Sequence, residues 1–406
     1  MRSADISRHS SSSFFANECW LKPALHAEQR PKHITGEQQS VRVLGLDIGG
    51  ANIKASTADG ESVSISFAIW QNRDGLRGIL KQLPLYRDAA PDIVALTMTA
   101  ELADCFQTKA EGVQFIIEAV QGVFAGSLIR VWLTSGEFAE ATDAIELPQL
   151  AGASNWHALA TWAGRAAPSG PAVLIDIGST TTDIIPLIDG LPVPEGRTDL
   201  ERLAASELLY TGVGRTPVCA IVQTVPLVPD EESAGPVGVC RIPVAAELFA
   251  TALDVHLLNG DVMADAGNCE TADGRPLTRE ASLNRLAHML CCDSTELSET
   301  QLVKIAEHIA EQQLQQITVA VKNRCQYVRK LVADSGMTKI HAVISGSGAW
   351  LAERVIQEVG ESSFAAVHNL SEMFVRNVSR SAPAFAVARL AAERCQDDLL
   401  PIESLY

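Results

Sequence analysis

The sequence lacks the features that would place a chain in a membrane or on nucleic acid. No apolar run approaches the ~18 residues of a membrane span, and the opening stretch MRSADISRHSSSSFFANECW has no apolar segment of the secretory type. Positive charge is scarce, because 32 Lys and Arg face 49 Asp and Glu and leave a net charge of −17. Such a surface repels a duplex or an anionic bilayer. We therefore expect a cytoplasmic protein with no nucleic-acid and no membrane partner.

Paired cysteines are missing as well. The nine cysteines include no C-x-x-C pair and no His-rich spacing, which is typical of reduced thiols in a cytosolic protein. What the chain does have is a globular composition, with 47% apolar and 20% charged residues over 406 residues. At about 150 residues per domain, that length allows two or three domains.

Composition and hydrophobic periodicity divide the chain into three parts. Residues 1–40 are polar, without a sustained period, and predict a loosely ordered extension. Residues 41–168 predict a first α/β domain, and residues 169–406 predict a second with inserted helices. The expected elements of the first domain are three strands joined by tight turns within 41–70, a helix near 74–83, a strand at 92–99, a helix near 110–124, a strand at 128–134 and a helix at 155–164.

One unit, a buried strand followed by a glycine turn and a second strand, occurs twice. The two copies begin at Asp47 and Asp176, 129 residues apart (176 − 47). The second copy continues into a hairpin turn expected at Asp189-Gly190. Such a repeat predicts two similar domains, each a mixed sheet with flanking helices, facing across a cleft.

The first copy carries a candidate phosphate-binding loop. Here Gly49, Gly50 and Asn52 would present N–H groups to phosphate oxygens, and Asp47 would hold Mg²⁺. Lys54, on the next strand, adds a positive charge. An ordinary hairpin explains these residues equally well.

The second copy is richer in polar groups. Asp176 and Asp183 flank a glycine and a row of hydroxyls. All three loop acids, Asp47, Asp176 and Asp183, are catalytic candidates, and Asp176 joins Asp47 as a candidate metal ligand. A simple β-branched strand remains the alternative. The phosphate-binding candidates of this loop are Gly178, Ser179, Thr180, Thr181 and Thr182.

A third glycine turn follows the expected strand at 339–345. Gly346, Ser347 and Gly348 stand before a helix and would accept a nucleotide or another anionic group. On its own this turn is a weak signal. The three turns in this order indicate a phosphate-binding protein more strongly than any one of them.

Further polar residues are candidates for the same site. Arg215 lies in a glycine-flanked loop and would contact a phosphate or carboxylate. Asn155 precedes an apolar helix, and its neighbour His157 has a side chain suited to proton transfer, so His157 is a catalytic candidate. A solvated arginine and an ordinary helix N-terminus are the alternatives.

Two weaker candidates lie further along the chain. His256, Asp261 and Asp265 have a spacing that would allow a metal site or a polar helix end. Asp273-Gly274-Arg275 reads most simply as a turn, with a substrate role for Arg275 as the alternative.

The three turns, DIGGANIKAS, DIGSTTTDIIP and ISGSGAW, resemble the two phosphate motifs and the adenosine motif of the actin, sugar kinase and heat-shock chaperone (ASKHA) superfamily. That superfamily has duplicated ribonuclease H-like domains. The DIGSTTTD loop is similar to the hydantoinase/oxoprolinase branch. More narrowly, GLDIGGANIKA, SNWHALA, ELLYTGVGRTPVCA, LFATALDVHLLNG and ETADGRP resemble a family linked to tetrahydromethanopterin-dependent one-carbon metabolism. The resemblance covers about residues 41–395.

This resemblance implies a transferase of methanofuran biosynthesis. Archaeal members of that family join an aminomethyl-furanmethanol diphosphate to γ-glutamyltyramine and release diphosphate. The implied partners are therefore a small-molecule diphosphate and a phenolic acceptor, with Mg²⁺ as cofactor; ATP and a homo-oligomer are also allowed.

The sequence departs from sugar kinases where they carry a catalytic Asp, because the comparable stretch reads ASNWH and Asn155 is no general base. The chain also lacks the extra domains of a full hydantoinase or oxoprolinase. An ATP-dependent hydrolase or kinase of the same superfamily stays open as the alternative, and a nucleotide-binding regulator ranks last.

Overall fold

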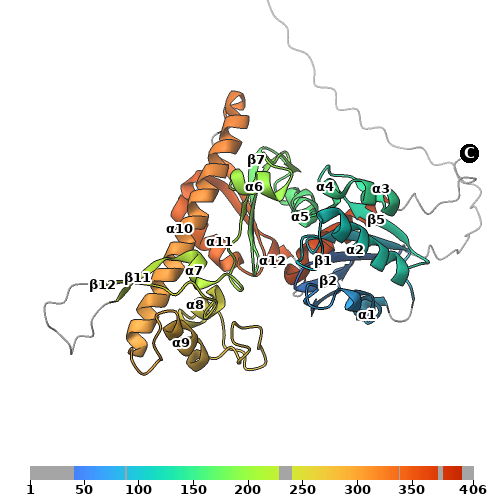
Figure 1. The fold of residues 1–406 in the computed structure, drawn as a ribbon. Helices are drawn as coiled ribbons and strands as arrows, with labels where there is room; N and C mark the ends of the chain where they lie inside the picture. Colours follow the sequence, from blue (N-terminus) through green and yellow to red (C-terminus); the bar gives the residue numbers. More distant parts are fainter. Residues whose placement is uncertain (1–40, 87–88, 228–239, 338, 374–377, 396–406) are drawn as a thin grey trace, which may run out of the picture. The chain divides into compact units, whose positions relative to one another are not determined.

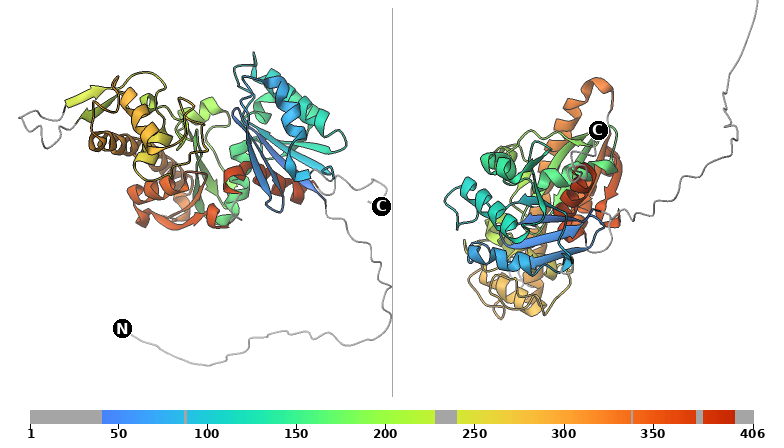
Figure 2. Two further views of the ribbon diagram at one scale, coloured as in Figure 1. Left: turned by 90° about the horizontal axis from the view of Figure 1, so that it is seen from below. Right: turned by 90° about the vertical axis from the view of Figure 1, so that its right-hand side faces the viewer.

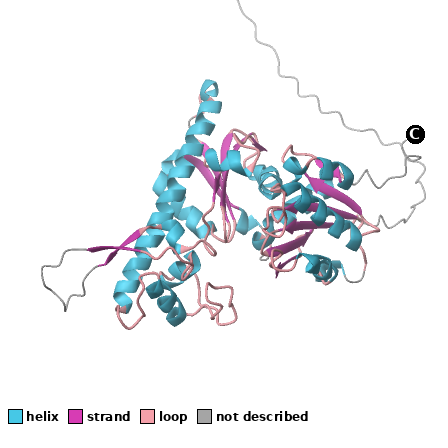
Figure 3. Cartoon of the chain, in the orientation of Figure 1, coloured by secondary structure: helices cyan, strands magenta, loops and turns pink. Residues whose placement is uncertain are grey.

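The computed structural model describes residues 41–86, 89–227, 240–337, 339–373 and 378–395 (Figures 1 and 3). The extension expected at 1–40 lies outside these residues. Two larger sheets dominate the described part, and each is built around a glycine-loop hairpin.

The first sheet has the strand order β3-β2-β1-β4-β5-β6. Strand β1 is antiparallel to β2 and parallel to β4, and β4 is parallel to β5. The strands are β1 (Val43–Ile48), β2 (Asn52–Thr57), β3 (Ser62–Ser66), β4 (Ile93–Met98), β5 (Leu128–Trp132) and β6 (Phe138–Glu140).

The second sheet repeats the same arrangement, with the order β10-β8-β7-β13-β14. Strand β7 is antiparallel to β8 and parallel to β13, and β13 is parallel to β14. Its strands are β7 (Pro171–Ile177), β8 (Thr182–Ile188), β9 (Leu191–Pro192), β10 (Leu208–Leu209), β13 (Ile340–Ser345) and β14 (Phe364–Asn369); a separate hairpin joins β11 (Thr224–Leu227) to β12 (Cys240–Pro243).

The central strands explain why the sheets form. Every residue of β1 and β4 is buried, and β7 and β13 each leave one residue half-buried. Strands covered on both faces read as continuous apolar runs, and these runs were visible in the sequence. The carboxyl ends of the parallel strands in each sheet therefore meet at one edge, the place where open α/β sheets bind ligands.

Helices cover the sheets or form the inserted region. Among them, α10 (Glu299–Leu331) begins with a capping box in which Ser298 and Gln301 satisfy each other's backbone N–H groups. The other α-helices are α1 (Leu76–Lys81), α2 (Lys109–Val123), α3 (Ala141–Glu146), α4 (Pro148–Ala151), α5 (Asn155–Ala163), α6 (Asp199–Ala204), α7 (Val218–Ile221), α8 (Ala252–Leu258), α9 (Arg279–His288), α11 (Ala349–Val359), α12 (Leu370–Met373) and α13 (Ala382–Arg394). The short 3₁₀ turns cover 73–75, 84–86, 164–166, 333–335, 361–363 and 379–381.

The last helix, α13, packs on the first sheet although it follows the second along the chain. Figure 2 shows α13, in red, beside the blue strands, and its contacts are with β1, β2, β4 and α5. Gly45 permits this approach, because a Cβ there would lie 2.0 Å from the carbonyl oxygen of Ala384. Both sheets belong to the same compact unit, which starts at Val41. The division of the chain at residue 168 therefore stays a prediction.

The fold class is confirmed as α/β, with two ribonuclease H-like sheets and helices on their faces. The expected turn is confirmed too, since Asp189 and Gly190 have φ of 50° and 75°, as a two-residue hairpin turn requires. The third strand is shorter than expected and ends at Ser66. No helix in the described ranges is long and apolar enough to cross a membrane.

Candidate functional site

The two glycine hairpins have the same backbone. In the first, Asp47 pairs with Lys54, and the Gly49 N–H donates to the Asn52 carbonyl at 3.0 Å. In the second, Asp176 pairs with Asp183. There the N–H of Gly178 donates to the carbonyl of Thr181 at 2.9 Å. The structure thus places the two predicted loops in equivalent positions, one at the edge of each sheet.

Asp47 is buried at the end of β1 beside a positive charge. The Nζ of Lys54 lies 3.5 Å from one carboxylate oxygen of Asp47, whereas the other oxygen, Oδ1, is buried without a partner. Burial raises the pKa of Asp47, and the Lys54 charge opposes that shift. The first loop therefore contains a balanced ion pair with one spare acceptor.

Asp176 has no cation of its own. Burial, followed by the like charge of Asp183, raises the pKa of Asp176 to about 6, and the charge of Asp47 acts in the same direction. Its Oδ1 is buried without a hydrogen-bond partner. Asp183 forms an ion pair with the buried guanidinium of Arg202. A cation placed between these loops would therefore stabilise Asp176 most.

The loop at 211–215 holds the second hairpin from one side. The N–H groups of Val213 and Gly214 donate to the carbonyls of Gly178 and Ser179, both at 3.0 Å. Only glycine fits at position 212, because a Cβ there would lie 2.4 Å from the carbonyl oxygen of Gly178. This packing fixes the second loop through its carbonyl groups.

The third glycine turn holds the same hairpin from the other side. The Gly348 N–H donates to the Ile177 carbonyl at 2.8 Å. Gly346 has φ of 91°, and a Cβ there would lie 2.8 Å from Oδ1 of Asp176. The predicted residues Gly346, Ser347 and Gly348 therefore adjoin the Asp176 loop, and the missing side chain at Gly346 leaves room for the Asp176 carboxylate.

Several backbone donors of the two loops are left over. The N–H groups of Gly50, Ser179 and Thr180 have no acceptor within the described part of the chain. Such unsatisfied N–H groups in a glycine turn form an anion-binding concavity. These donors lie on both hairpins, as a bridging diphosphate would require.

Arg215 connects the hairpins. Its Nε donates to Oγ1 of Thr180 at 2.9 Å, and its Nη1 lies 3.0 Å from the side-chain oxygen of Asn52 once that amide is oriented to satisfy both of its ends. The predicted arginine therefore touches one predicted residue in each loop. The guanidinium group of Arg215 supplies further N–H donors for an anion held between the two loops.

His157 and Asn155 lie on α5, and within the described residues neither side chain forms a hydrogen bond to the carboxylates of the loops. His157 packs against the rings of Trp132 and Trp156, and its Nδ1 lies 3.3 Å from Oγ1 of Thr161. Burial, followed by the charge of Arg202, lowers the pKa of His157 to about 4. The imidazole is therefore neutral at pH 7, and its catalytic role stays a prediction.

The weaker candidates serve other contacts. His256 lies 3.1 Å from Asp261 and 2.9 Å from Gln313, while the N–H of Asp265 donates to the backbone of Leu277. Arg275 is exposed in the turn that was expected. Across the described ranges no three His, Cys, Asp or Glu side chains converge on a metal position.

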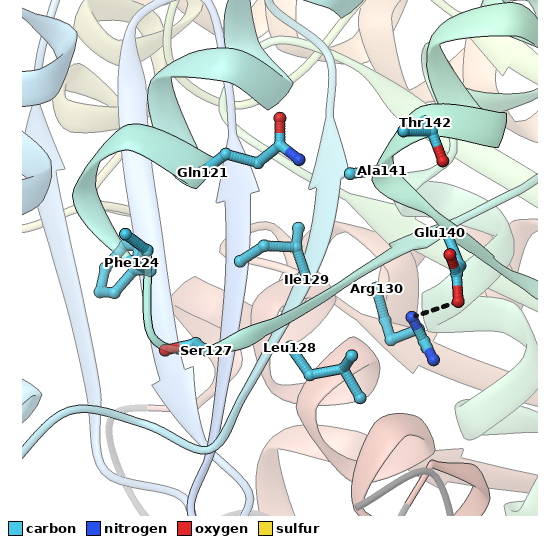
Figure 4. A pocket seen from close by; sticks show the side chains of 10 residues that line it. Gln121, Phe124, Ser127, Leu128, Ile129, Arg130, Glu140, Ala141 and Thr142 are labelled. Carbon is cyan, nitrogen blue, oxygen red and sulfur yellow. Dashed lines mark ion pairs between the residues drawn. The ribbon is translucent and has the colours of Figure 1, made fainter.

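Two cavities lie elsewhere. One, of about 260 Å³, lies at the start of β5, and Phe124, Arg130 and Glu140 are among the residues that line it (Figure 4). Arg130 and Glu140 form an ion pair at 3.5 Å. Another, of about 310 Å³, adjoins His256 and Arg354. Neither is lined by the phosphate loops, so the expected cleft stays a prediction.

Sequence reasoning missed two charged residues next to the loops. Arg202 balances Asp183 and stacks over the ring of Trp156, with its Cζ 4.1 Å from the centroid. Glu101 follows β4 and is 1% exposed, with Oε2 lacking a partner. The only signal for Glu101 was an acid just after a buried strand, the pattern that identified Asp47 and Asp176.

Known proteins resemble this chain over most of the residues that the structure describes. The model of the hydantoinase/oxoprolinase family matches residues 92–394. The (4-{4-[2-(γ-L-glutamylamino)ethyl]phenoxymethyl}furan-2-yl)methanamine synthase of Methanocaldococcus jannaschii is 32% identical over 353 residues, which cover 86% of this chain and 97% of that protein. The Methanococcus vannielii protein of the same name is 30% identical over 54% of this chain and 89% of its own length.

Among solved structures, nucleotide-free acetone carboxylase gives a TM-score of 0.47 at 12% identity, covering 86% of this chain and 70% of the other. The family match spans most of the described residues, and the archaeal relatives match over almost their full length. The chain is therefore a member of the hydantoinase/oxoprolinase family.

Proposed function

We propose that this chain is a synthase of methanofuran biosynthesis, which joins an aminomethyl-furanmethanol diphosphate to γ-glutamyltyramine and releases diphosphate. The observation that carries the proposal is the 32% identity to the M. jannaschii synthase over 97% of that enzyme's length. The product in the relative's name contains a phenoxymethyl-furan, so the enzyme must form an ether between a phenol oxygen and a furanylmethyl carbon.

The two hairpins suit a diphosphate. The spare N–H groups of Gly50, Ser179 and Thr180 would each donate a hydrogen bond to a phosphate oxygen, and Arg215 reaches both loops. Lys54 adds positive charge near the first loop. We assign the diphosphate to this position.

The carboxylates suit Mg²⁺. Asp47 and Asp176 each have a buried oxygen without a partner, and Mg²⁺ is typically bound by one or two carboxylates together with substrate phosphates. These two residues would hold the ion, and the ion would neutralise charge on the leaving diphosphate.

The remaining chemistry needs positioning more than covalent catalysis. The phenol oxygen forms a bond to the CH₂ carbon, the carbon–oxygen bond to diphosphate breaks, and the diphosphate leaves with that electron pair. The furan ring spreads the positive charge that develops on the carbon. Holding both substrates in line supplies much of the rate, and one protein group must accept the phenol proton.

Mass spectrometry tests this proposal. Purified protein is incubated with Mg²⁺, the furan diphosphate and γ-glutamyltyramine, with parallel reactions that lack the acceptor or contain ATP alone. We expect the ether product and free diphosphate only in the complete reaction. Formation of ADP in the ATP tube, without any ether, would overturn the proposal in favour of an ATP-dependent hydrolase or kinase.

A further inference from the structure

Glu101 directly follows the position in the first sheet that corresponds to the third glycine turn of the second, because the N–H groups of Ala100 and Gly348 donate to the equivalent carbonyls of Ile48 and Ile177. Strand β4 lies parallel to β1 just as β13 lies parallel to β7. After β13 the chain makes a small-residue turn, whereas after β4 it continues through Thr99 and Ala100 to Glu101. Both N–H groups at 99 and 100 donate to the carbonyl of Ile48, at 2.9 and 3.1 Å. The acid is therefore tied to the start of the first phosphate loop.

The surroundings of Glu101 hold its carboxylate in place but leave one oxygen unused. Lys109, the first residue of α2, places Nζ 3.6 Å from Oε1. A Cβ on Gly152 would lie 3.0 Å from the same oxygen, so the carboxylate packs tightly against this glycine. Oε2 is buried and has no hydrogen-bond partner among the residues that the structure describes. A buried carboxylate oxygen without a donor is costly unless it serves a ligand.

Other unpartnered oxygens come from neighbouring segments. Oγ of Ser154 and Oγ1 of Thr134 are buried without partners. The backbone connects these segments: Gly152 bridges Met98 at the end of β4, and the Thr134 N–H donates to the Leu150 carbonyl at 2.9 Å. Buried polar groups without partners in the described residues therefore occur at the carboxyl ends of β4 and β5, the end of a parallel sheet at which ligands bind.

Charges from both sheets act on Glu101. Burial and the like charge of Asp199 raise the pKa of Glu101 to about 7, and Lys109 opposes the rise. Asp199 is the first residue of α6 and pairs with Arg202 at 3.3 Å, the arginine that also binds Asp183. The charge that acts on Glu101 from α6 therefore belongs to the same ion-pair group that balances Asp183.

We propose that Glu101 is the general base of the ether-forming reaction. Its Oε2 accepts the proton of the acceptor's phenol as the phenol oxygen bonds to the furanylmethyl carbon, and the diphosphate departs with the electrons of the broken carbon–oxygen bond. This inference rests on the proposed function. The inference identifies the group that accepts the phenol proton, which the proposed function leaves open.

The other acids and the histidine are less suited to this role. Asp47 and Asp183 are already paired with Lys54 and Arg202. Asp176 is assigned to the metal, and the conjugate acid of His157 is too strong, with its pKa lowered to about 4. A base whose pKa lies near the working pH combines the ionised form with useful proton affinity, and Glu101 meets that condition.

Glu101→Gln tests the assignment. We expect kcat to fall about 10²- to 10⁴-fold, with the KM for the diphosphate unchanged, since general base catalysis contributes factors of that size. The wild-type rate should rise with pH through about 7, as Glu101 loses its proton, and the variant should lack this limb. An acceptor with a ring-fluorinated, more acidic phenol should recover much of the loss. Glu118→Gln, at an exposed position of α2, is the matched control and should behave as wild type.

Lys109→Met provides an independent test should Glu101→Gln not fold. Removing a positive charge that lowers the pKa of Glu101 should move the rising limb to higher pH. If the wild-type enzyme makes the ether and Glu101→Gln has the same rate and pH profile as wild type, the base assignment alone is overturned. The same conclusion follows if the rising part of the pH–rate profile does not move in Lys109→Met. Wild-type enzyme that makes no ether would instead overturn the proposed function.

Discussion

The two glycine hairpins share a backbone but differ in charge. Opposite Asp47 the first has Lys54, whereas opposite Asp176 the second has a further acid, Asp183. The first pair balances itself within the loop, and the second depends on Arg202 from a helix outside it. Asp176 is left with a raised pKa and no cation. The comparison teaches that two loops with the same backbone can differ in charge, and that the second loop, around Asp176, is the one with a carboxylate suited to a bound cation.

The largest expected effect comes from removing the uncompensated charge. Asp176→Asn should lower kcat about 10²- to 10³-fold, the cost of losing one preorganised electrostatic group. The side chain keeps its shape, so circular dichroism and thermal unfolding should show a folded protein. Steady-state rates of ether formation check the prediction, and a fully active variant would remove Asp176 from the site.

Asp47→Asn sharpens the comparison between the loops. It frees the ammonium of Lys54 to meet a phosphate oxygen, so part of the lost stabilisation returns and the fall in kcat should be about tenfold. Equal losses in the two variants would show that the charge difference between the hairpins does not matter for turnover.

Stability should depend most on the ion pair that supports the second hairpin. Asp183→Asn leaves the buried guanidinium of Arg202 with only Asp199 as an acidic partner in the described structure, at 3.3 Å. Breaking a buried pair from one side costs about 3–5 kcal/mol of unfolding free energy. Asp199→Asn, at a more exposed carboxylate, should cost about 1 kcal/mol or less. Urea denaturation measures both, and similar losses would contradict a dominant role for Asp183.

The pH dependence of stability should differ between the loops as well. Burial and the charge of Asp183 raise the pKa of Asp176 to about 6 in the folded chain, from the usual 3.8 of an aspartate, so the folded state favours the protonated form. Its unfavourable contribution is absent below about pH 4 and grows until about pH 6, where it reaches roughly 3 kcal/mol at 1.36 kcal/mol per pKa unit. Unfolding free energies of Asp176→Asn minus wild type should rise across this window. A flat difference would mean that Asp176 is solvated or already paired.

Much of this arrangement could be predicted from the sequence because it depends on local patterns. The buried strands read as apolar runs, the glycine turns mark the loops, and the 129-residue offset aligns Asp47 with Asp176 and Lys54 with Asp183. The turn at Asp189-Gly190 follows from residue preference alone. These features need no knowledge of distant contacts.

What escaped prediction depends on residues far apart in the sequence. Arg202 balances Asp183 only because α6 returns to β8, and Glu101 joins the site only because β4 lies beside β1. The packing of α13 on the first sheet has the same origin. Spacing likewise suggested a cluster of His256, Asp261 and Asp265, but Asp265 turns to the backbone of Leu277. A pattern along the chain cannot show which partner neutralises a buried charge.

The last test, which concerns the shared backbone of the hairpins, uses their glycines. Gly212→Ala puts a Cβ 2.4 Å from the carbonyl of Gly178 and 2.6 Å from the nitrogen of Thr180, so the second loop must shift, at about 1–3 kcal/mol of stability. Gly50→Ala in the first loop meets no atom within 4 Å and should leave thermal unfolding unchanged. Its KM for the diphosphate should nevertheless rise, because the added methyl group occupies the space where a phosphate would contact the spare N–H. If the KM for the diphosphate is unchanged in Gly50→Ala, the diphosphate binds the second hairpin alone. The two loops would then share a backbone conformation, but only one would bind the substrate.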